Sequence, residues 1–193
     1  ACTLVTSGYA LVGKVGAETI TLNSASYTAT TATQHVGSNK AVTVSGLALS
    51  GADAGNYTLT QPTDVTATIT ARAITVTAAT DSKTYDGDTT SDGVPTVTSG
   101  ALQGNDTITS ITQTYDNKNI GTANKTMTAS GVVTDENSGN NYTLTLSTNA
   151  TGTISAKALT VTGITVTSRT YDDANACTLV TSGYALVGKV GAE

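Results

Sequence analysis

The feature that most constrains this chain is a letter-for-letter internal repeat. Residues Ala1–Glu18 read ACTLVTSGYALVGKVGAE, and residues Ala176–Glu193 read the same. The two copies lie 175 residues apart, as the positions of Cys2 and Cys177 show. Identity over such a stretch does not arise by chance, so the sequence predicts one long repeat unit followed by the start of the next. We expect the chain to be a window on a longer array, with both ends arbitrary cuts.

The 175-residue unit is itself double. Residues 55–77 (GNYTLTQPTDVTATITARAITVT) align with residues 140–162 (NNYTLTLSTNATGTISAKALTVT), and residues 39–46 align with residues 124–131. The offsets between matched segments vary from 85 to 92 residues, which places the length differences in loops. A period of about 85 to 90 residues indicates stacked domains, because the coils of a solenoid are much shorter.

The strands that read Ala-Ile-Thr-Val and Ala-Leu-Thr-Val mark where each module is expected to begin. On this basis we predict three parts. They are a first module lacking its first strand (residues 1–71), a complete second module (residues 72–156) and the start of a third (residues 157–193).

Alternation of apolar and polar residues predicts the secondary structure. In Ala73–Thr77 (AITVT), Ile74 and Val76 share one face of a strand while the threonines share the other. Such alternation is typical of antiparallel sheets with one wet face, and no stretch sustains helical periodicity. We therefore predict an all-β chain of tandem immunoglobulin-like β-sandwich modules in an extended array. A β-grasp-like module is the alternative, and a three-turn helix packed on a sheet would favour it.

One local motif favours the immunoglobulin-like sandwich. Asp53, Gly55 and Tyr57 have the D-x-G-x-Y spacing of a tyrosine corner, in which the tyrosine hydroxyl bonds back to upstream backbone. The second module keeps Gly139 and Tyr142 with one extra residue between them. We expect both hydroxyls to bond to backbone. We also expect buried side chains at Tyr57, Leu59, Tyr142 and Leu144.

Four segments resemble one known family: TYDG at residues 84–87, YDNKNIGTANKTMTASG at 115–131, VTVSGLALSGADAGNYTL at 42–59 and KALTVTG at 157–163. They are similar to the YDG/MBG-type repeats of very large bacterial surface proteins, including filamentous-haemagglutinin-like adhesins. The resemblance covers nearly the whole chain. It implies secretion to the cell surface and a role in adhesion or fibre formation.

Two turns depart from the family pattern. The second motif copy reads Tyr171-Asp172-Asp173, so Asp fills the position that Gly87 fills in the first copy, although Asp adopts positive φ less readily. Tyr27 is followed by TATTATQHVG, which is longer than the string after Tyr115 and lacks its Asp-Asn-Lys-Asn. We expect the loops to differ and the fold to be kept.

The two cysteines occupy the same position in successive repeats. Aligning ACTLVTSG with GVPTVTSG (residues 93–100) places each cysteine where the other module has Val94. Cys2 and Cys177 are therefore either small hydrophobes of the core or, as unpaired thiols in an oxidising compartment, partners in an intermolecular disulfide. A bridge between them within one extended chain is excluded, because disulfide Cα atoms lie within about 7 Å.

Candidate chemistry is otherwise sparse. The acidic loops at Asp86, Asp88 and Asp92 and at residues 135–137 (DEN) contain calcium-type ligands, but tight turns demand the same residue types. His35 lies in a polar loop without a partner motif, and we expect it to be solvent-exposed. No nucleophile-elbow, zincin, P-loop or CxxC motif occurs, so we expect no enzyme, no cofactor and no metal site.

Charge indicates which partners to expect. Only 12% of the residues are charged and the net charge is −5, whereas nucleic acids and anionic membranes select basic patches. No apolar run is long enough to span a bilayer. We expect the partners to be further copies of the repeat, with lateral self-association open. The function we expect is an extended structural filament outside the cell, and the alternative is an adhesive module that binds glycan or protein through its loops.

Overall fold

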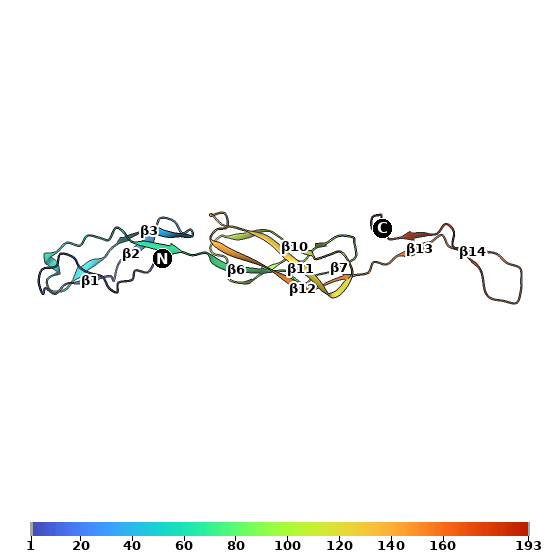
Figure 1. Ribbon diagram of the computed structural model, residues 1–193, viewed down its shortest axis with the longest axis horizontal. Helices are drawn as coiled ribbons and strands as arrows, with labels where there is room; N and C mark the ends of the chain where they lie inside the picture. Colours follow the sequence, from blue (N-terminus) through green and yellow to red (C-terminus); the bar gives the residue numbers. More distant parts are fainter. Residues whose placement is uncertain (1, 193) are drawn as a thin grey trace. The chain divides into compact units, whose positions relative to one another are not determined.

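The computed structural model describes residues 2–192, which are almost entirely β-structure and irregular loops (Figure 1). The described part contains no α-helix, and its one helical segment is a single 3-10 turn, η1 (Ala54–Asn56). No helix in residues 2–192 has the length and apolar character to cross a bilayer. The prediction of an all-β chain is therefore confirmed, and the helix that would have favoured the β-grasp alternative is not found in the described residues.

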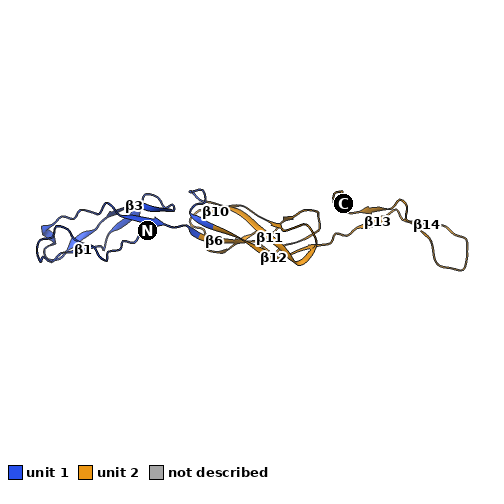
Figure 2. Cartoon of the chain, in the orientation of Figure 1, with its two compact units in different colours: residues 1–72, 135–143 blue, residues 73–134, 144–193 orange. Residues whose placement is uncertain are grey.

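The chain forms two compact units (Figure 2). The first contains residues 1–72 together with residues 135–143, and the second contains residues 73–134 and 144–193. The division at Arg72 lies beside the predicted start of the second module, but residues 135–143 group with the first unit. The division into three modules stays a prediction.

The first unit holds five short strands. They are β1 (Thr21–Asn23), β2 (Thr28–Thr31), β3 (Gly37–Ser45), β4 (Ala48–Ser50) and β5 (Thr66–Ile69). β1 pairs with β4, and β3 lies between β2 and β5, all antiparallel. The core is small: Ala29, Val42, Val44 and Leu47 are buried, and half-buried residues including Leu59 and Val65 pack against them.

The second unit contains a seven-stranded sheet. Its strands are β6 (Arg72–Thr77), β7 (Ser82–Thr84), β8 (Thr90–Ser91), β9 (Thr96–Ser99), β10 (Thr107–Tyr115), β11 (Gly121–Thr134) and β12 (Tyr142–Ser155). The order is β8-β10-β11-β12-β6-β9, and β7 pairs with β12 in parallel. Two further pairs follow in the chain: β13 (Thr160–Thr162) with β16 (Ala185–Val187), and β14 (Thr165–Val166) with β15 (Leu179–Val180).

The alternation in β6 explains why this strand contributes to the core of the second unit. Ile74 is 1% exposed and Val76 is 0% exposed, because every second side chain points into the core. Val76 packs with Met127 and Ile154 in the main cluster. Burial of these apolar side chains is the principal stabilising term available to a chain without Phe or Trp.

The two units pair equivalent hairpins in different registers. In the second unit Tyr115 lies opposite Met127, whereas in the first unit Thr31, not Tyr27, lies opposite Val42, the counterpart of Met127. The sequence after Tyr27 is longer than the sequence after Tyr115. The first unit accommodates this difference by a shift in the pairing register of β2 and β3, which places Thr31, four residues after Tyr27, opposite Val42. An even slip keeps each side chain on its own face of the sheet, so the core pattern survives.

The two copies of the repeated segment keep the same backbone conformation at their glycines. Gly8 and Gly183 both have φ of 86°, and Gly16 and Gly191 have φ of 55° and 57°. Pairing differs, because only the second copy forms strands, β15 and β16, with residues that precede it in the chain. Local turn geometry is thus set by the repeated sequence, and strand pairing by the neighbours that are present.

Candidate functional site

In the first unit, the predicted tyrosine corner makes the expected hydrogen bond between the tyrosine hydroxyl and upstream backbone. The Tyr57 hydroxyl accepts a hydrogen bond from the backbone N–H of Val15 at 3.0 Å, upstream in the chain, and it donates to the Glu18 carboxylate. The hydrogen bond to Glu18 raises the pKa of Tyr57 above its ordinary value, and the Val15 amide opposes that shift. Tyr57 and Leu59 are half-buried, so the expectation that both side chains are buried is wrong.

Asp53 fixes the turn that leads into Tyr57. Its Oδ2 accepts from the Thr19 N–H at 2.8 Å, and its own N–H donates to the Thr19 carbonyl at 3.4 Å. Asp53 precedes η1, which contains Gly55 and is followed directly by Tyr57. The D-x-G-x-Y spacing therefore marks a compact turn tied to the segment near Thr19.

In the second copy, the corner is organised by Asp135. Its Oδ1 accepts from the N–H groups of Asn137 at 2.8 Å and Gly139 at 2.6 Å, and its Oδ2 accepts from Asn141 at 3.0 Å. Burial raises the pKa of Asp135, but the three amides outweigh this and hold it below its ordinary value. Gly139 has φ of 81°, which suits glycine, and Tyr142 is buried as expected. Leu144 is half-buried, against expectation. A backbone partner for the Tyr142 hydroxyl stays a prediction.

Two further tyrosine hydroxyls accept hydrogen bonds from backbone amides, and these contacts were not predicted. The Tyr27 hydroxyl accepts from the Leu4 N–H at 3.0 Å, and the Tyr9 hydroxyl accepts from the Leu22 N–H at 3.1 Å. With Tyr57, these contacts hold the strandless segment before Thr21 to the first unit. The only sequence signal was that tyrosine is the sole aromatic residue, which does not identify the amides it binds.

The TYDG turn is closed by Lys83. Its Nζ lies 2.8 Å from Asp86 Oδ1 and 2.7 Å from Asp88 Oδ1, and 5.6 Å from the centre of the Tyr115 ring. Hydrogen bonds from Lys83 and from Thr90 hold the pKa of Asp88 well below its ordinary value. Asp86 and Asp88, considered above as calcium ligands, thus have a cationic partner within the chain.

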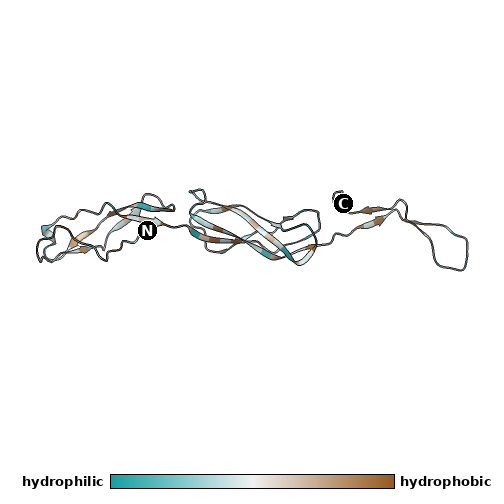
Figure 3. Ribbon diagram, viewed as in Figure 1, coloured by the Kyte–Doolittle hydropathy of each residue, from teal (hydrophilic) through white to brown (hydrophobic). Residues whose placement is uncertain are grey.

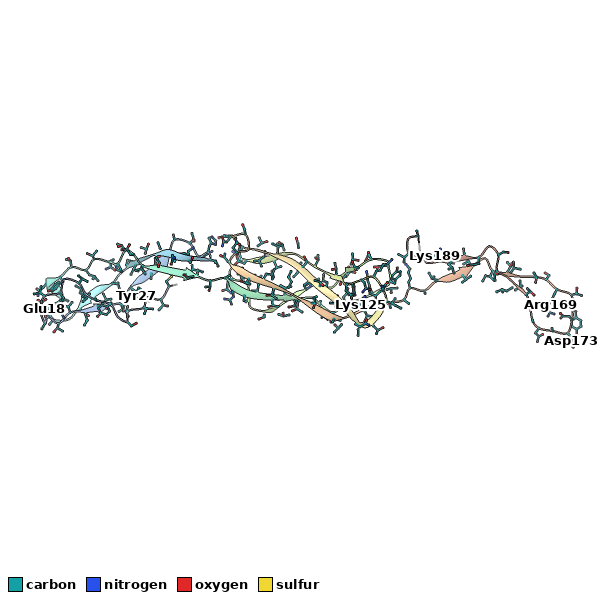
Figure 4. All side chains as sticks on the ribbon, in the orientation of Figure 1. Glu18, Tyr27, Lys125, Arg169, Asp173 and Lys189 are labelled. Carbon is teal, nitrogen blue, oxygen red and sulfur yellow. The ribbon has the colours of Figure 1, made fainter. Side chains whose placement is uncertain are left out.

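The second copy of that turn repeats the arrangement in the loop after β14. Arg169 binds Asp172 with the same spacing as Lys83 and Asp86, and Figure 4 shows Arg169 and Asp173 close together in this loop. Asp173 has φ of 58° where Gly87 has 89°. The backbone has positive φ at this position in both copies, and Asp adopts it at a conformational cost.

Lys125, labelled in Figure 4, is the one buried cation in the described part of the chain. Its Nζ lies 2.9 Å from Asp116 Oδ1 and 2.5 Å from Asn117 Oδ1, in the loop between β10 and β11. The ammonium holds the pKa of Asp116 below its ordinary value. In the first unit, Lys40 instead donates to Thr33 Oγ1 at 2.7 Å and to the His35 carbonyl at 2.8 Å. The DNKN string and its replacement therefore supply different acceptors to equivalent lysines.

Gln113 is buried and fully paired. Its Oε1 accepts from the Ala79 N–H at 2.7 Å, and its Nε2 donates to the Ala79 carbonyl at 3.0 Å and to Ser91 Oγ at 2.8 Å. Beside it, burial and the Asp81 carboxylate raise the pKa of Tyr115 to about 12. Ser91 Oγ accepts from Gln113 and donates to Asp81 Oδ2, so these groups are paired inside the unit.

The cysteines and the histidine have different surroundings. Cys2 is half-buried against the core of the first unit, as the small-hydrophobe interpretation predicts, whereas Cys177 is exposed. Both are free thiols, and an intermolecular disulfide stays a prediction. His35 is half-buried rather than exposed, and its Nδ1 lies 3.3 Å from Asn141 Nδ2.

The candidate residues lie mainly in turns whose carboxylates are paired within the chain. Within residues 2–192, no group of three or more His, Cys, Asp or Glu side chains is arranged to hold a metal ion. The carboxylates of Asp86, Asp88 and Asp135 instead accept hydrogen bonds from lysine or backbone groups. These hydrogen bonds and ion pairs fix the conformation of the loops between strands.

Comparison with known families gives a match to two successive stretches of the chain. The sequence pattern of the YDG domain matches residues 1–66 and residues 70–151. Comparisons with curated proteins and with solved structures gave no significant match. The two matched stretches cover most of the 193 residues, so the chain belongs to the YDG domain family.

Proposed function

We propose that this chain is a structural repeat segment of a secreted bacterial surface fibre or adhesin stalk. The observation that carries the proposal is the identity of residues 1–18 and 176–193, together with two tandem matches to one domain family. A chain that repeats one β-module end to end adds length with each copy, which is the requirement of a stalk. Outside the cell is where such a filament acts.

The polar contacts support a scaffold. Four polar side chains bind partners within their own unit: Lys83, Lys125, Gln113 and Asp135. A binding surface for glycan or protein presents exposed aromatic or charged anchors in a recurring loop. Here the hydroxyls of Tyr9, Tyr27 and Tyr57 accept hydrogen bonds from backbone N–H groups, so these tyrosines hold segments of the unit together.

Immunoglobulin-like sandwich topology is part of this proposal. It is supported by the upstream backbone bond of the Tyr57 hydroxyl and by the buried Tyr142 after Gly139. Sandwich modules suit a stalk because antiparallel strands joined by short loops fold within a single repeat. The β-grasp alternative lacks a supporting observation.

The test is to label intact cells that produce the parent protein with antibodies raised against this chain. The proposal predicts label along filaments that extend from the cell surface, and removal of the label by external protease. Label found only inside permeabilised cells would contradict it. Binding of the purified chain to a glycan or host-protein array, saturable and abolished by changes in one loop, would instead favour the adhesive module.

A further inference from the structure

The second unit contains a pocket beside the TYDG turn. It has a volume of about 460 Å³ and is lined by Tyr85 of that turn, Ile120 of the β10–β11 loop, residues 156–159 before β13 and residues 188–190 after β16. Small-molecule sites in proteins have volumes of roughly 300–1,000 Å³. The pocket is therefore large enough to hold a small organic ligand.

Two glycines permit the close approach of the segments that line this pocket. Gly188 has φ of 103°, and a Cβ there would lie 3.0 Å from the Ala158 carbonyl oxygen. Gly87, the last residue of TYDG, has φ of 89°, and a Cβ there would lie 2.7 Å from Cγ1 of Val190. A larger residue at either position would press on these neighbours and strain the backbone. The pocket thus lies where residues 188–190 pack against β13 and the TYDG turn.

The lining of the pocket is mostly aliphatic. Ile120 is 63% exposed and Leu159 is 49% exposed, so much of their apolar surface is uncovered. Figure 3 shows β16, which leads into residues 188–190, as strongly apolar. The Tyr85 ring already has a cationic neighbour, since Lys118 Nζ lies 5.8 Å from its centre. A linear alkyl chain therefore matches this lining better than an aromatic ring does.

The pocket also has two lysines without an ion pair. Lys83, Lys125 and Arg169 each pair with an aspartate. Lys157 and Lys189 line the pocket and have no carboxylate partner among residues 2–192 (Lys189 is labelled in Figure 4). The chain has only nine lysine and arginine residues against fourteen acidic ones, so two uncompensated cations at one pocket favour an anionic ligand.

We propose that this pocket binds an amphiphile with one alkyl chain and a carboxylate head group, such as a medium-chain fatty acid. The alkyl chain lies against Ile120, Leu159 and Val190 in this arrangement. Lysine stems cover apolar surface while their ammonium groups stay in water, so Lys157 and Lys189 hold the head group at the mouth. Such a site is independent of the stalk proposal, because it is formed within the second unit alone.

The experiment titrates dodecanoate, below its micelle concentration, into the 193-residue chain by isothermal titration calorimetry. Saturable binding of one molecule per chain is expected. Dodecyltrimethylammonium has the same alkyl chain with the opposite charge, and acetate has the same head group without the chain. Both are expected to bind about tenfold more weakly or less. Absence of saturable dodecanoate binding, or equal affinity for the two long-chain amphiphiles, overturns the proposal.

Charge reversal tests the head-group position. Lys189→Glu is expected to weaken dodecanoate binding by about fivefold or more and to strengthen binding of dodecyltrimethylammonium. Lys14→Glu is the matched control, because Lys14 is the equivalent of Lys189 in the repeated segment but belongs to the first unit. It is expected to leave both affinities unchanged. Equal effects of the two substitutions would show that the anion is held by overall charge and not by this pocket.

A charge on the apolar lining tests the alkyl-chain position. Ile120→Asp is expected to abolish dodecanoate binding, and the exposure of Ile120 means that the unit still folds, which circular dichroism checks. Val132→Asp is the control, because Val132 is 62% exposed in the same unit but does not line the pocket, and it is expected to retain binding. Binding that survives Ile120→Asp, or that is lost equally in both variants, overturns the proposal. Either result leaves the cell-surface test of the stalk untouched.

Discussion

Lys125 is a buried lysine of the second unit, and its charge is paired with one aspartate. Its side chain is 6% exposed, whereas its partner Asp116 keeps 40% exposure. A buried ammonium is costly unless it is paired, so the pair serves to offset the desolvation of Lys125. The same reasoning explains why the first unit, without the DNKN string, surrounds Lys40 with oxygen acceptors.

We predict that Asp116→Asn lowers the free energy of unfolding of the second unit by about 1–2 kcal/mol, less than for a fully buried pair because Asp116 is partly solvated. Adding Lys125→Met should restore most of the loss, since the uncompensated charge is then removed. Asp92→Asn, an equal charge change at an exposed residue, is the control and should have little effect. Urea unfolding of the full chain measures all three.

The effect of Asp116→Asn has a defined pH dependence. Lys125 lowers the folded-state pKa of Asp116, so the carboxylate contributes stability above its unfolded pKa and loses it as pH falls through the folded value. The difference between wild type and Asp116→Asn should therefore shrink on acidification below about pH 4. A difference that is unchanged, or that grows, would show that the ion pair is not its cause.

At the scale of elements, β6 and β13 are one sequence in two environments. Ile74 in β6 is buried between two neighbouring strands, while Leu159 before β13 is half exposed beside a single partner. The same alternation thus produces a core strand only when both neighbours are present. In this chain, burial of the strand therefore depends on the strands that flank it.

We predict that Ile74→Ala destabilises the second unit by about 2–5 kcal/mol, as large-to-small core changes do. Leu159→Ala, the equivalent change in the tail, should alter the unfolding free energy of the dilute monomeric chain by less than about 0.5 kcal/mol. Denaturant midpoints at low protein concentration provide the measurement. Equal losses for the two variants would mean that the tail is already part of a packed module.

Much of the fold could be predicted from sequence, because period-2 alternation and turn residues are local signals. The strand at Ile74 and Val76 and the backbone hydrogen bond of Tyr57 follow from such signals. The slipped hairpin could not be predicted, because register depends on how extra residues after Tyr27 are distributed between loop and strand. The burial of Lys125 was also missed, since no local pattern marks a lysine that folds back on its own loop.

At the scale of the whole molecule, the predicted division is one complete module, residues 72–156, with parts of two others on either side. The seven-stranded sheet of the second unit draws its strands from β6 to β12, so residues 72–156 contain every strand of that sheet. A stalk built from such repeats carries load through each module in turn, and the complete one is the element expected to resist extension. The segments on either side of residues 72–156 are expected to extend at lower force, because fewer paired strands hold them.

The most direct test is single-molecule extension of the full chain held at its two ends. One dominant unfolding event is predicted, with a gain in contour length of roughly 300 Å less the folded length, as expected for residues 72–156 at about 3.6 Å per residue. Ile74→Ala should lower the force of that event, and Leu159→Ala should leave it unchanged. Featureless extension, or a dominant event whose length corresponds to residues 1–71, would contradict a load-bearing module formed by residues 72–156.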